Sequence, residues 1–234
     1  QQYMEKTYKF RIYPSKEQIS TLDNVLHTCK YLYNTQLGYE RYVYQKERRF
    51  ADRVDLNNIL PDLKIINPSL KTIHSQVLQN VNDKVIKSFK SFFNRVQKGQ
   101  KAGYPRFKSF NHYNSFTYPQ SGFTFSQNKL KLSKIGEVSI KLHRNIRGKI
   151  KTLSIIKTPA HKWFACFSVQ QEITPPTRSS NKAVGIDLGL EHFATLSNGI
   201  VIDNPRHLQK SLEFLKRKSR QLSKKQKGSS NRKK

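Results

Sequence analysis

The chain has 234 residues, of which 44 are Lys or Arg and 15 are Asp or Glu, so its formal net charge is +29. A charge of this size opposes a compact fold unless a polyanion neutralises it, so nucleic acid is the first expected partner. The sequence has no apolar run of about 18 residues and no signal or lipidation motif, which excludes a membrane-spanning or lipid-anchored protein. Cys29 and Cys166 stand alone and form neither a metal pair nor a disulfide framework, which indicates the cytoplasm.

A strand followed by a long helix is expected at the start of the chain. Over Tyr8–Tyr13 apolar residues alternate with others, which predicts a half-buried strand with a basic face that carries Arg11. Ser15–Gln18 fits a capping box, and apolar residues at helical spacing predict a helix that continues to about Phe50. Its tyrosines lie among arginines and could stack on bases, although a helix-bundle core predicts the same pattern.

A second long helix is expected from Ser69 to Val96, after a polar link punctuated by Pro61 and Pro68. Its buried face is predicted by apolar residues that recur every four positions, namely Ile73, Val77, Val81, Val85, Phe89 and Phe92. The other faces carry amides and ammonium groups, and Gln76 and Gln79 would suit base edges if the helix met a duplex. A plain solvent-exposed face would have the same composition.

The next segments predict a loop and a barrel. A Gly- and Pro-rich stretch interleaves basic and aromatic residues, so we expect a clamp on a nucleic-acid backbone formed by Lys101, Tyr104, Arg106 and Lys108. Short apolar stretches with a period of two then follow from Phe116 to Val169 and predict an antiparallel barrel. The strand at 8–13 would complete this barrel, which makes the helical block an insertion, and 174–181 is a predicted linker.

The stretch from Lys182 to Leu190 is apolar but has a carboxylate, Asp187, at its centre. A buried strand is predicted, and a buried charge costs several kcal/mol unless it is paired or bound to a metal. Such a strand could hold Asp187 where it coordinates a hard cation such as Mg²⁺. A hairpin follows with Asn198–Gly199 at its turn, the pair that a type I′ turn prefers, so we expect the opening of an RNase-H-like fold. A buried strand whose Asp caps a neighbouring loop is the alternative.

Residues 206–234 contain twelve Lys or Arg and a single acid, Glu213. Four leucines at 208, 212, 215 and 222 predict a helix with an apolar seam. Beyond this helix the chain is basic and Ser-rich, and we expect a disordered or phosphate-bound tail that carries Lys224, Lys225 and Lys227.

Four dispersed blocks resemble the TnpB/OrfB family of IS200/IS605-type insertion sequences, relatives of the Cas12-type nucleases. In order they are Tyr8–Pro14, Gly103–Lys108, Gly185–Gly189 and Leu222–Ser229. The resemblance implies an α+β fold in which a small, wedge-like antiparallel β-barrel precedes the start of a RuvC, RNase-H-like α/β domain. The implied boundaries are a first barrel strand at 1–14, an inserted helical recognition domain at 15–103, the rest of the barrel at 104–178 and the RuvC beginning with its basic tail at 179–234.

The resemblance also implies a function, that of a transposon-associated, RNA-guided DNA endonuclease. A guide RNA would pair with target double-stranded DNA while the protein reads a short flanking motif, and Gln79 is placed similarly to a motif-reading glutamine of the family. Asp187 matches the first of three carboxylates that hold Mg²⁺, whereas the other two and a zinc-binding Cys cluster have no counterpart here. One carboxylate cannot hold two ions about 4 Å apart. We therefore expect a truncated, nucleic-acid-binding form that is inactive alone unless a longer copy supplies the missing parts; the first methionine, Met4, agrees with a fragment.

Two other classes of protein share single features with this chain. An actin-like sugar kinase or ATPase also uses G-I-D-x-G, to approach phosphate, but places it near the start of a longer domain, whereas 184 residues precede Gly185 here. A non-catalytic RNA-binding protein would need the positive charge but not the strand around Asp187. Co-purified RNA of one defined sequence would distinguish the RNA-guided protein from both.

Overall fold

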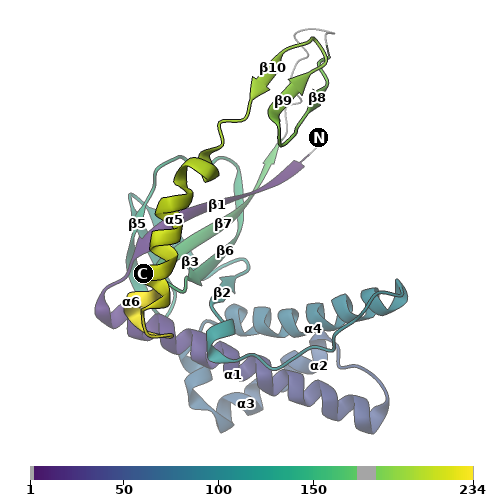
Figure 1. Ribbon diagram of the computed structural model, residues 1–234. Coiled ribbons are helices and arrows are strands. Elements are labelled where there is room, and N and C mark those ends of the chain that lie inside the picture. Colours follow the sequence, from purple (N-terminus) through teal and green to yellow (C-terminus); the bar gives the residue numbers. More distant parts are fainter. Residues whose placement is uncertain (1–2, 173–182, 234) are drawn as a thin grey trace. The chain divides into compact units, whose positions relative to one another are not determined.

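The computed structural model describes residues 3–172 and 183–233. The chain divides into two compact units, with the boundary between residues 173 and 174 (Figure 1). The first unit contains an antiparallel sheet and a block of helices, and the second contains a small sheet and two helices. No described helix has the length and apolar character needed to cross a membrane.

An antiparallel sheet in the order β2-β6-β7-β1-β5-β4-β3 forms the first unit's barrel. Its strands are β1 (Tyr3–Tyr13), β2 (Ser115–Tyr118), β3 (Phe123–Ser126), β4 (Lys129–Leu132), β5 (Gly136–Lys141), β6 (Lys149–Lys157) and β7 (Trp163–Glu172). β1 lies between β5 and β7, and its residues Tyr3 to Ile12 pair with β7. The first strand of the chain therefore joins strands that follow more than a hundred residues later, as the alternating patterns predict.

The sheet closes almost into a barrel, because its two edge strands meet through side chains. Tyr118 at the end of β2 and Phe123 at the start of β3 have ring centroids 6.2 Å apart. Phe167, on the interior strand β7, contacts the rings of Phe123, Phe125 and Phe10 at centroid distances of 6.4, 5.7 and 6.0 Å. Aromatic side chains thus fill the interior and hold the two edges together.

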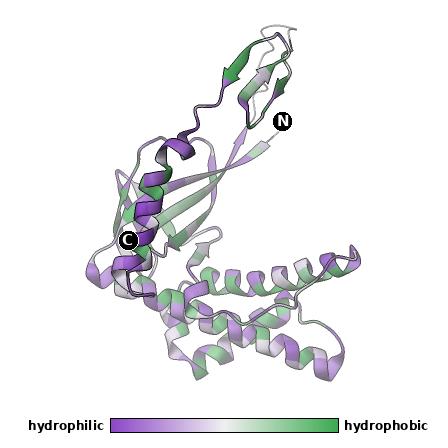
Figure 2. Ribbon diagram, viewed as in Figure 1, coloured by the Kyte–Doolittle hydropathy of each residue, from purple (hydrophilic) through white to green (hydrophobic). Residues whose placement is uncertain are grey.

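The helical block lies between β1 and β2 in the chain. It consists of α1 (Lys16–Glu47), α2 (Arg53–Asn58), α3 (Leu60–Ile66), the 3₁₀ helix η1 (Pro68–Thr72) and α4 (Ser75–Gln97). The capping box at the start of α1 is present, since Gln18 N–H donates to Ser15 Oγ and Ser15 N–H donates to Gln18 Oε1. Both α1 and α4 contact β2, and their apolar stripes are visible in Figure 2.

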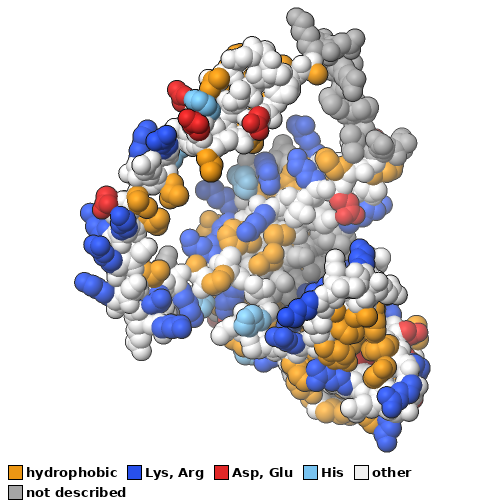
Figure 3. Space-filling model, turned by 45° about the vertical axis from the view of Figure 1, so that its right-hand side comes forward, with side chains coloured by type: hydrophobic (Ala, Val, Ile, Leu, Met, Phe, Trp, Pro, Cys, Tyr) orange, Lys and Arg blue, Asp and Glu red, His pale blue; other side chains and the backbone are white. Residues whose placement is uncertain are grey.

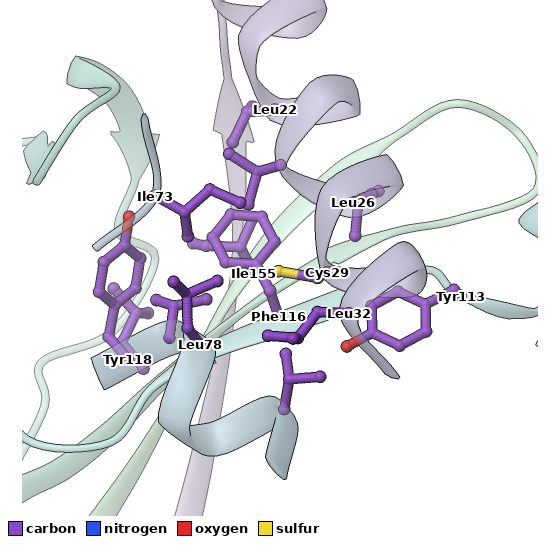
Figure 4. Close-up of a cluster of buried hydrophobic side chains, with 14 of the residues drawn as sticks. Leu22, Leu26, Cys29, Leu32, Ile73, Leu78, Tyr113, Phe116, Tyr118 and Ile155 are labelled. Atoms are coloured by element: carbon purple, nitrogen blue, oxygen red, sulfur yellow. The ribbon is translucent and has the colours of Figure 1, made fainter. Parts of the chain in front are cut away.

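A continuous core joins the long helices to the barrel. Figure 4 shows Leu22, Leu26 and Cys29 of α1 facing Phe116 and Ile155 of the sheet. Burial raises the pKa of the Cys29 thiol to about 12, so this cysteine is an inert core residue. The helices and the barrel therefore share one hydrophobic core and form a single folded unit.

The polar link between the long helices is itself helical over α2, α3 and η1. It buries Leu56 of α2, Leu60 of α3 and Leu70 of η1, and these spaced leucines are the apolar signal that the prolines obscured. The second long helix also begins at Ser75 and not at Ser69, because residue Ile73 has an extended backbone and interrupts the helical path.

The second unit has a three-stranded antiparallel sheet in the order β10-β9-β8, followed by two helices. The elements are β8 (Ile186–Asp187), β9 (His192–Leu196), β10 (Val201–Asp203), α5 (His207–Ser223) and α6 (Ser230–Lys233). The expectation of a buried strand is wrong here, since Ile186 is 64% and Leu190 93% exposed. No described residue of the second unit packs over the side chains of Ile186 and Leu190. Ala194 is the one buried hydrophobic residue in the described part of this unit.

Two local expectations in the second unit are also corrected. The turn at Asn198–Gly199 is not type I′, because only Gly199 has a positive φ, of 87°. Gly199 N–H donates to the Leu196 carbonyl, and this tight turn followed by a left-handed glycine is the longer hairpin form with a bulge. The basic tail is not irregular over its described part, since residues after α5 turn into α6 and Arg232 donates to the Leu222 and Lys225 carbonyls. The predicted linker at 174–181 lies outside the described residues.

Candidate nucleic-acid interface

The loop between α4 and β2 is tied to α1 by two residues of that helix. Asn34 Oδ1 accepts from Lys108 N–H at 2.8 Å, and Asn34 Nδ2 donates to the Lys108 carbonyl at 3.0 Å. The Arg41 guanidinium lies over the rings of Tyr104 and Phe107, at 5.3 and 4.6 Å from their centroids. The predicted clamp is therefore anchored to α1 at Lys108 and beside Tyr104 and Phe107, which lowers the entropy that its backbone loses on binding.

The clamp presents two aromatic rings, Tyr104 and Phe107, and three cations to solvent. Tyr104 packs edge-on against Phe89 and Phe92 of α4, yet 38% of it remains exposed. The side chains of Lys101, Arg106 and Lys108 are exposed. A supported ring beside exposed cations matches what single-stranded nucleic acid needs, namely stacking for a base and charge for its phosphates.

A lysine-lined cavity of about 360 Å³ lies beside the clamp. Lys84 and Lys87 of α4 line it together with Lys108 and His112. Lys84 Nζ donates to the Ser115 carbonyl at 3.2 Å, and burial lowers the pKa of this ammonium group. A partly desolvated cation gains more from an anion than a fully solvated one, so the cavity suits a phosphate group.

The sequence places Lys84 among the ammonium groups on the outer faces of the second long helix, which would suit backbone phosphates, but it does not single out Lys84 or His112 as site residues. Lys84 directly precedes Val85, which belongs to the buried apolar row of α4. A lysine next to a buried position is expected to be half-buried, and this is the sequence signal for Lys84. His112 has no sequence signal of this kind, because its place follows from the path of the loop across α1.

The two glutamines of α4 have different roles in the structure. Gln76 Oε1 accepts from both the N–H and the Oγ of Ser121, at 3.0 and 2.9 Å, so its amide ties α4 to the β2–β3 turn. Gln79 is half-buried, and its amide makes no hydrogen bond within the described residues. Gln79 is therefore the better placed of the two to contact a base edge.

The outer face of the barrel carries Arg11 among aromatic rings. Its guanidinium lies 5.5 Å from the Tyr13 centroid and 5.2 Å from that of Phe164. Lys9 lies over the same Phe164 ring at 4.4 Å. The rings hold these cations on the β1 and β7 surface without neutralising them, so Arg11 keeps its charge for a polyanion.

The residues around Asp187 do not fit a pair of metal ions. Asp187 is exposed and pairs across the sheet with Thr195, and Asp203 contacts His192 with an Oδ1–Nδ1 distance of 3.3 Å. Throughout 3–172 and 183–233, no three His, Cys, Asp or Glu side chains gather where they could hold a metal ion. The same finding applies to zinc, since no cluster of His and Cys ligands is present in this described part.

The three lysines of the basic tail are exposed and belong to the second unit. Lys225 Nζ donates to the Asn231 carbonyl at 2.9 Å, which links the turn after α5 to α6, whereas Lys224 and Lys227 project from the same turn. Figure 3 shows Lys and Arg side chains over much of the visible surface and few acidic ones. The cationic character is thus general and not confined to one patch.

Comparison with known proteins shows what the chain is similar to. A family described as "Probable transposase", of OrfB IS605 type, matches residues 165–234, and a "Helix-turn-helix domain" of the same OrfB IS605 type matches 4–49. The chain is 30% identical over its full length to a "Putative RNA-guided DNA endonuclease" of Streptomyces pristinaespiralis, of which it covers 58%. The chain is therefore similar to the OrfB proteins of IS605-type insertion sequences.

A second relative is similar to the chain over almost the same span. "Putative RNA-guided DNA endonuclease InsQ" of Escherichia coli K12 is 27% identical over 97% of the chain and 56% of the relative. The chain thus spans little more than half the length of these relatives. Among solved structures, a Cas12f1–sgRNA–target DNA complex contains a chain that is 16% identical, with a TM-score of 0.44, over 94% of this chain and 62% of that one.

The helix-turn-helix description does not fit the first residues of the chain. Residues 4–49 form strand β1 and the single long helix α1, with no second helix in this segment. A helix-turn-helix motif needs two helices joined by a short turn, the second of which enters the major groove. The long apolar face of α1 is buried against α4 and the barrel, so this segment supports the clamp.

Proposed function

We propose that this chain is the nucleic-acid-binding part of a transposon-associated, RNA-guided DNA endonuclease of the prokaryotic cytoplasm. In this proposal it holds a guide RNA and a target duplex with a short flanking motif. The observation that carries the proposal is the clamp of residues 101–108, which is anchored to α1 at Lys108 and places exposed aromatic rings and three exposed cations next to the lysine-lined cavity. The net charge of +29 and the printed names of both relatives also support it.

The chemistry of binding follows from these side chains. A base would stack on the exposed part of the Tyr104 ring while its neighbouring phosphates meet Arg106 and Lys108. The next phosphate along the strand would enter the cavity, where Lys84 and Lys87 supply charge. These contacts read no base sequence, which agrees with a protein whose sequence recognition comes from guide pairing.

The nuclease part of the proposal concerns Asp187. In the family reading Asp187 supplies the first carboxylate of a two-Mg²⁺ site, and Mg²⁺ would activate water and stabilise the leaving oxygen. Since the described residues do not fit two ions, the other ligands would have to come from elsewhere, for example from a longer copy of the protein. We therefore expect no Mg²⁺-dependent DNA nicking by these 234 residues alone.

RNA that co-purifies with the chain tests this function. We expect RNA of one defined sequence, because guide binding requires a particular structured RNA. The variant Arg106→Gln/Lys108→Gln should retain several-fold less of it, since both cations lie in the clamp. The matched control Lys216→Gln/Lys218→Gln removes the same charge from α5. Equal losses in the two variants, or RNA of mixed sequence, would favour a general RNA-binding protein.

Gln79 tests the reading of the flanking motif. Gln79→Ala should reduce discrimination between the preferred motif and others by about 1–3 kcal/mol, because an amide pairs bidentately with adenine N6 and N7. RNA affinity should change little, and competition binding with duplexes that differ only in the motif measures both quantities. The control is Asn80→Ala, an adjacent half-exposed amide on α4. A uniform loss on every duplex would assign Gln79 to phosphate contact or to folding.

A further inference from the structure

An apolar cavity of about 490 Å³ lies in the helical block, separate from the clamp and from the lysine-lined cavity. It is bounded by residues of α1, of the segment that enters α2, and of α4. Three phenylalanines line it, and the ring of Phe50 lies 5.4 Å from that of Phe89 and 4.7 Å from that of Phe93. An aromatic cavity of this size is suited to a flat organic group.

One buried acid, Glu40 of α1, also lines this cavity and is only 1% exposed. Its Oε2 accepts from the Ala51 N–H at 2.8 Å, whereas its buried Oε1 has no hydrogen-bond partner. Burial raises the pKa of this carboxyl, and the Ala51 N–H opposes the rise. A buried oxygen without a donor is costly, so the carboxyl would gain from a ligand that brings an N–H group.

The charges at the rim decide against a phosphate ligand. Arg53 is paired with Asp83 through an Nε–Oδ1 contact of 2.8 Å, so its charge is already compensated. Asp52 also lines the cavity and caps α2 with its side chain, and it adds negative charge next to Glu40. Lys90 is the one lining cation without a described ion pair. A neutral ring with an amino group fits this rim better than an anion does.

We propose that this cavity binds a single unstacked nucleobase that bears an exocyclic amino group, with the amino group donating to Glu40 Oε1 and the ring packed against the phenylalanine cluster. The proposal rests on the proposed function only for the class of partner, nucleic acid. A carboxylate accepts well from the N4 amino group of cytosine. Uracil presents carbonyl oxygens on both sides of its single N–H, and these would face the carboxylate oxygen unfavourably.

Neutral nucleosides test the proposal, because without phosphate the general positive charge of the chain contributes nothing. The reporter is the Ala51 amide in a ¹H–¹⁵N spectrum of the full chain, since this N–H donates to Glu40. Cytidine at millimolar concentration should shift that signal saturably, and uridine should bind about tenfold more weakly. Absence of a saturable shift with cytidine, or equal shifts with both nucleosides, would overturn the proposal.

Variants separate recognition from a structural role of Glu40. Glu40→Gln keeps an acceptor for Ala51 but replaces the free oxygen with an N–H₂ group, which suits the O4 of uracil. The preference for cytidine should therefore disappear or reverse, while Glu5→Gln, an exposed acid on β1, should leave it unchanged. A lower melting temperature of Glu40→Gln with unchanged cytidine preference would mean that the carboxyl is only structural and would refute the proposal.

A second variant keeps the test decisive if Glu40→Gln does not fold. Val54→Trp alters a cavity residue that is 61% exposed, so the fold should tolerate it while the larger side chain obstructs the opening. Cytidine binding should fall at least several-fold, and unchanged binding would overturn the proposal. None of these measurements involves a guide RNA or a duplex, so their failure leaves the co-purification test of the proposed function unaffected.

Discussion

Raising the salt concentration from about 50 to about 200 mM is expected to weaken binding of structured RNA by roughly a thousandfold or more. Each phosphate that a Lys or Arg side chain neutralises releases condensed counterions, and added salt opposes this release. The clamp and the lysine-lined cavity alone bring together Lys84, Lys87, Arg106 and Lys108, and Lys9 and Arg11 add two cations on the barrel. Fluorescence anisotropy with a labelled RNA at several salt concentrations measures the slope.

Single variants show which residues contribute to the dependence of RNA affinity on salt concentration. Arg106→Gln should reduce the magnitude of the slope by about one, since it removes one phosphate contact. Glu213→Gln, on the exposed helix α5, changes the charge by the same amount in the opposite direction and should not reduce it. An affinity that stays flat between these salt concentrations would show that RNA does not bind through the basic surface.

Phe167→Ala is expected to lower the free energy of unfolding by about 3–5 kcal/mol, the usual cost of truncating a buried phenylalanine. Phe167 is completely buried and contacts the rings of Phe10, Phe123 and Phe125, so its loss would leave a cavity at the centre of the barrel. Urea unfolding followed by circular dichroism measures the change. A drop in RNA affinity should follow only where the barrel has begun to unfold.

The control for this prediction comes from the same strand. Phe164 lies on the opposite face of β7, where Lys9 and Arg11 approach its ring, and it is only half-buried. Phe164→Ala should cost about 1 kcal/mol, the order of an exposed cation–π contact. Equal destabilisation by the two variants would contradict an interior packed around Phe167.

Most of the first unit could be predicted from local pattern. The strands of the barrel follow a period of two, and the helices α1 and α4 follow apolar rows, because one face of each element must be buried. The capping box at Ser15 also fixed the start of α1. The late start of α4 was missed because Ile73 is buried outside the helix yet falls in the apolar row of α4.

The candidate sites were less predictable, because they depend on contacts between distant residues. The clamp was found from its alternation of basic and aromatic residues, but its anchors, Asn34 and Arg41, lie on α1 and carry no motif. The path of the chain at Ala51 gives one oxygen of Glu40 a hydrogen-bond donor and leaves the other without one, and no sequence pattern reveals this path. The exposure of Ile186 could not be inferred either. An apolar residue in a predicted strand is expected to be buried, and the sequence pattern does not tell which residues would cover it.

The position of β1 has a consequence for synthesis of the protein. This first strand pairs with β5 and, over ten residues, with β7, which ends at Glu172. Its hydrogen bonds therefore cannot form until the ribosome has released most of the first unit, and pairings of such long sequence separation form slowly. The helices α1 to α4 are translated before β5 and β7, so β1 still lacks its partners while the helical block is made. Until then the nascent chain exposes an unpaired strand, so the barrel is the part of this protein that most depends on uninterrupted translation.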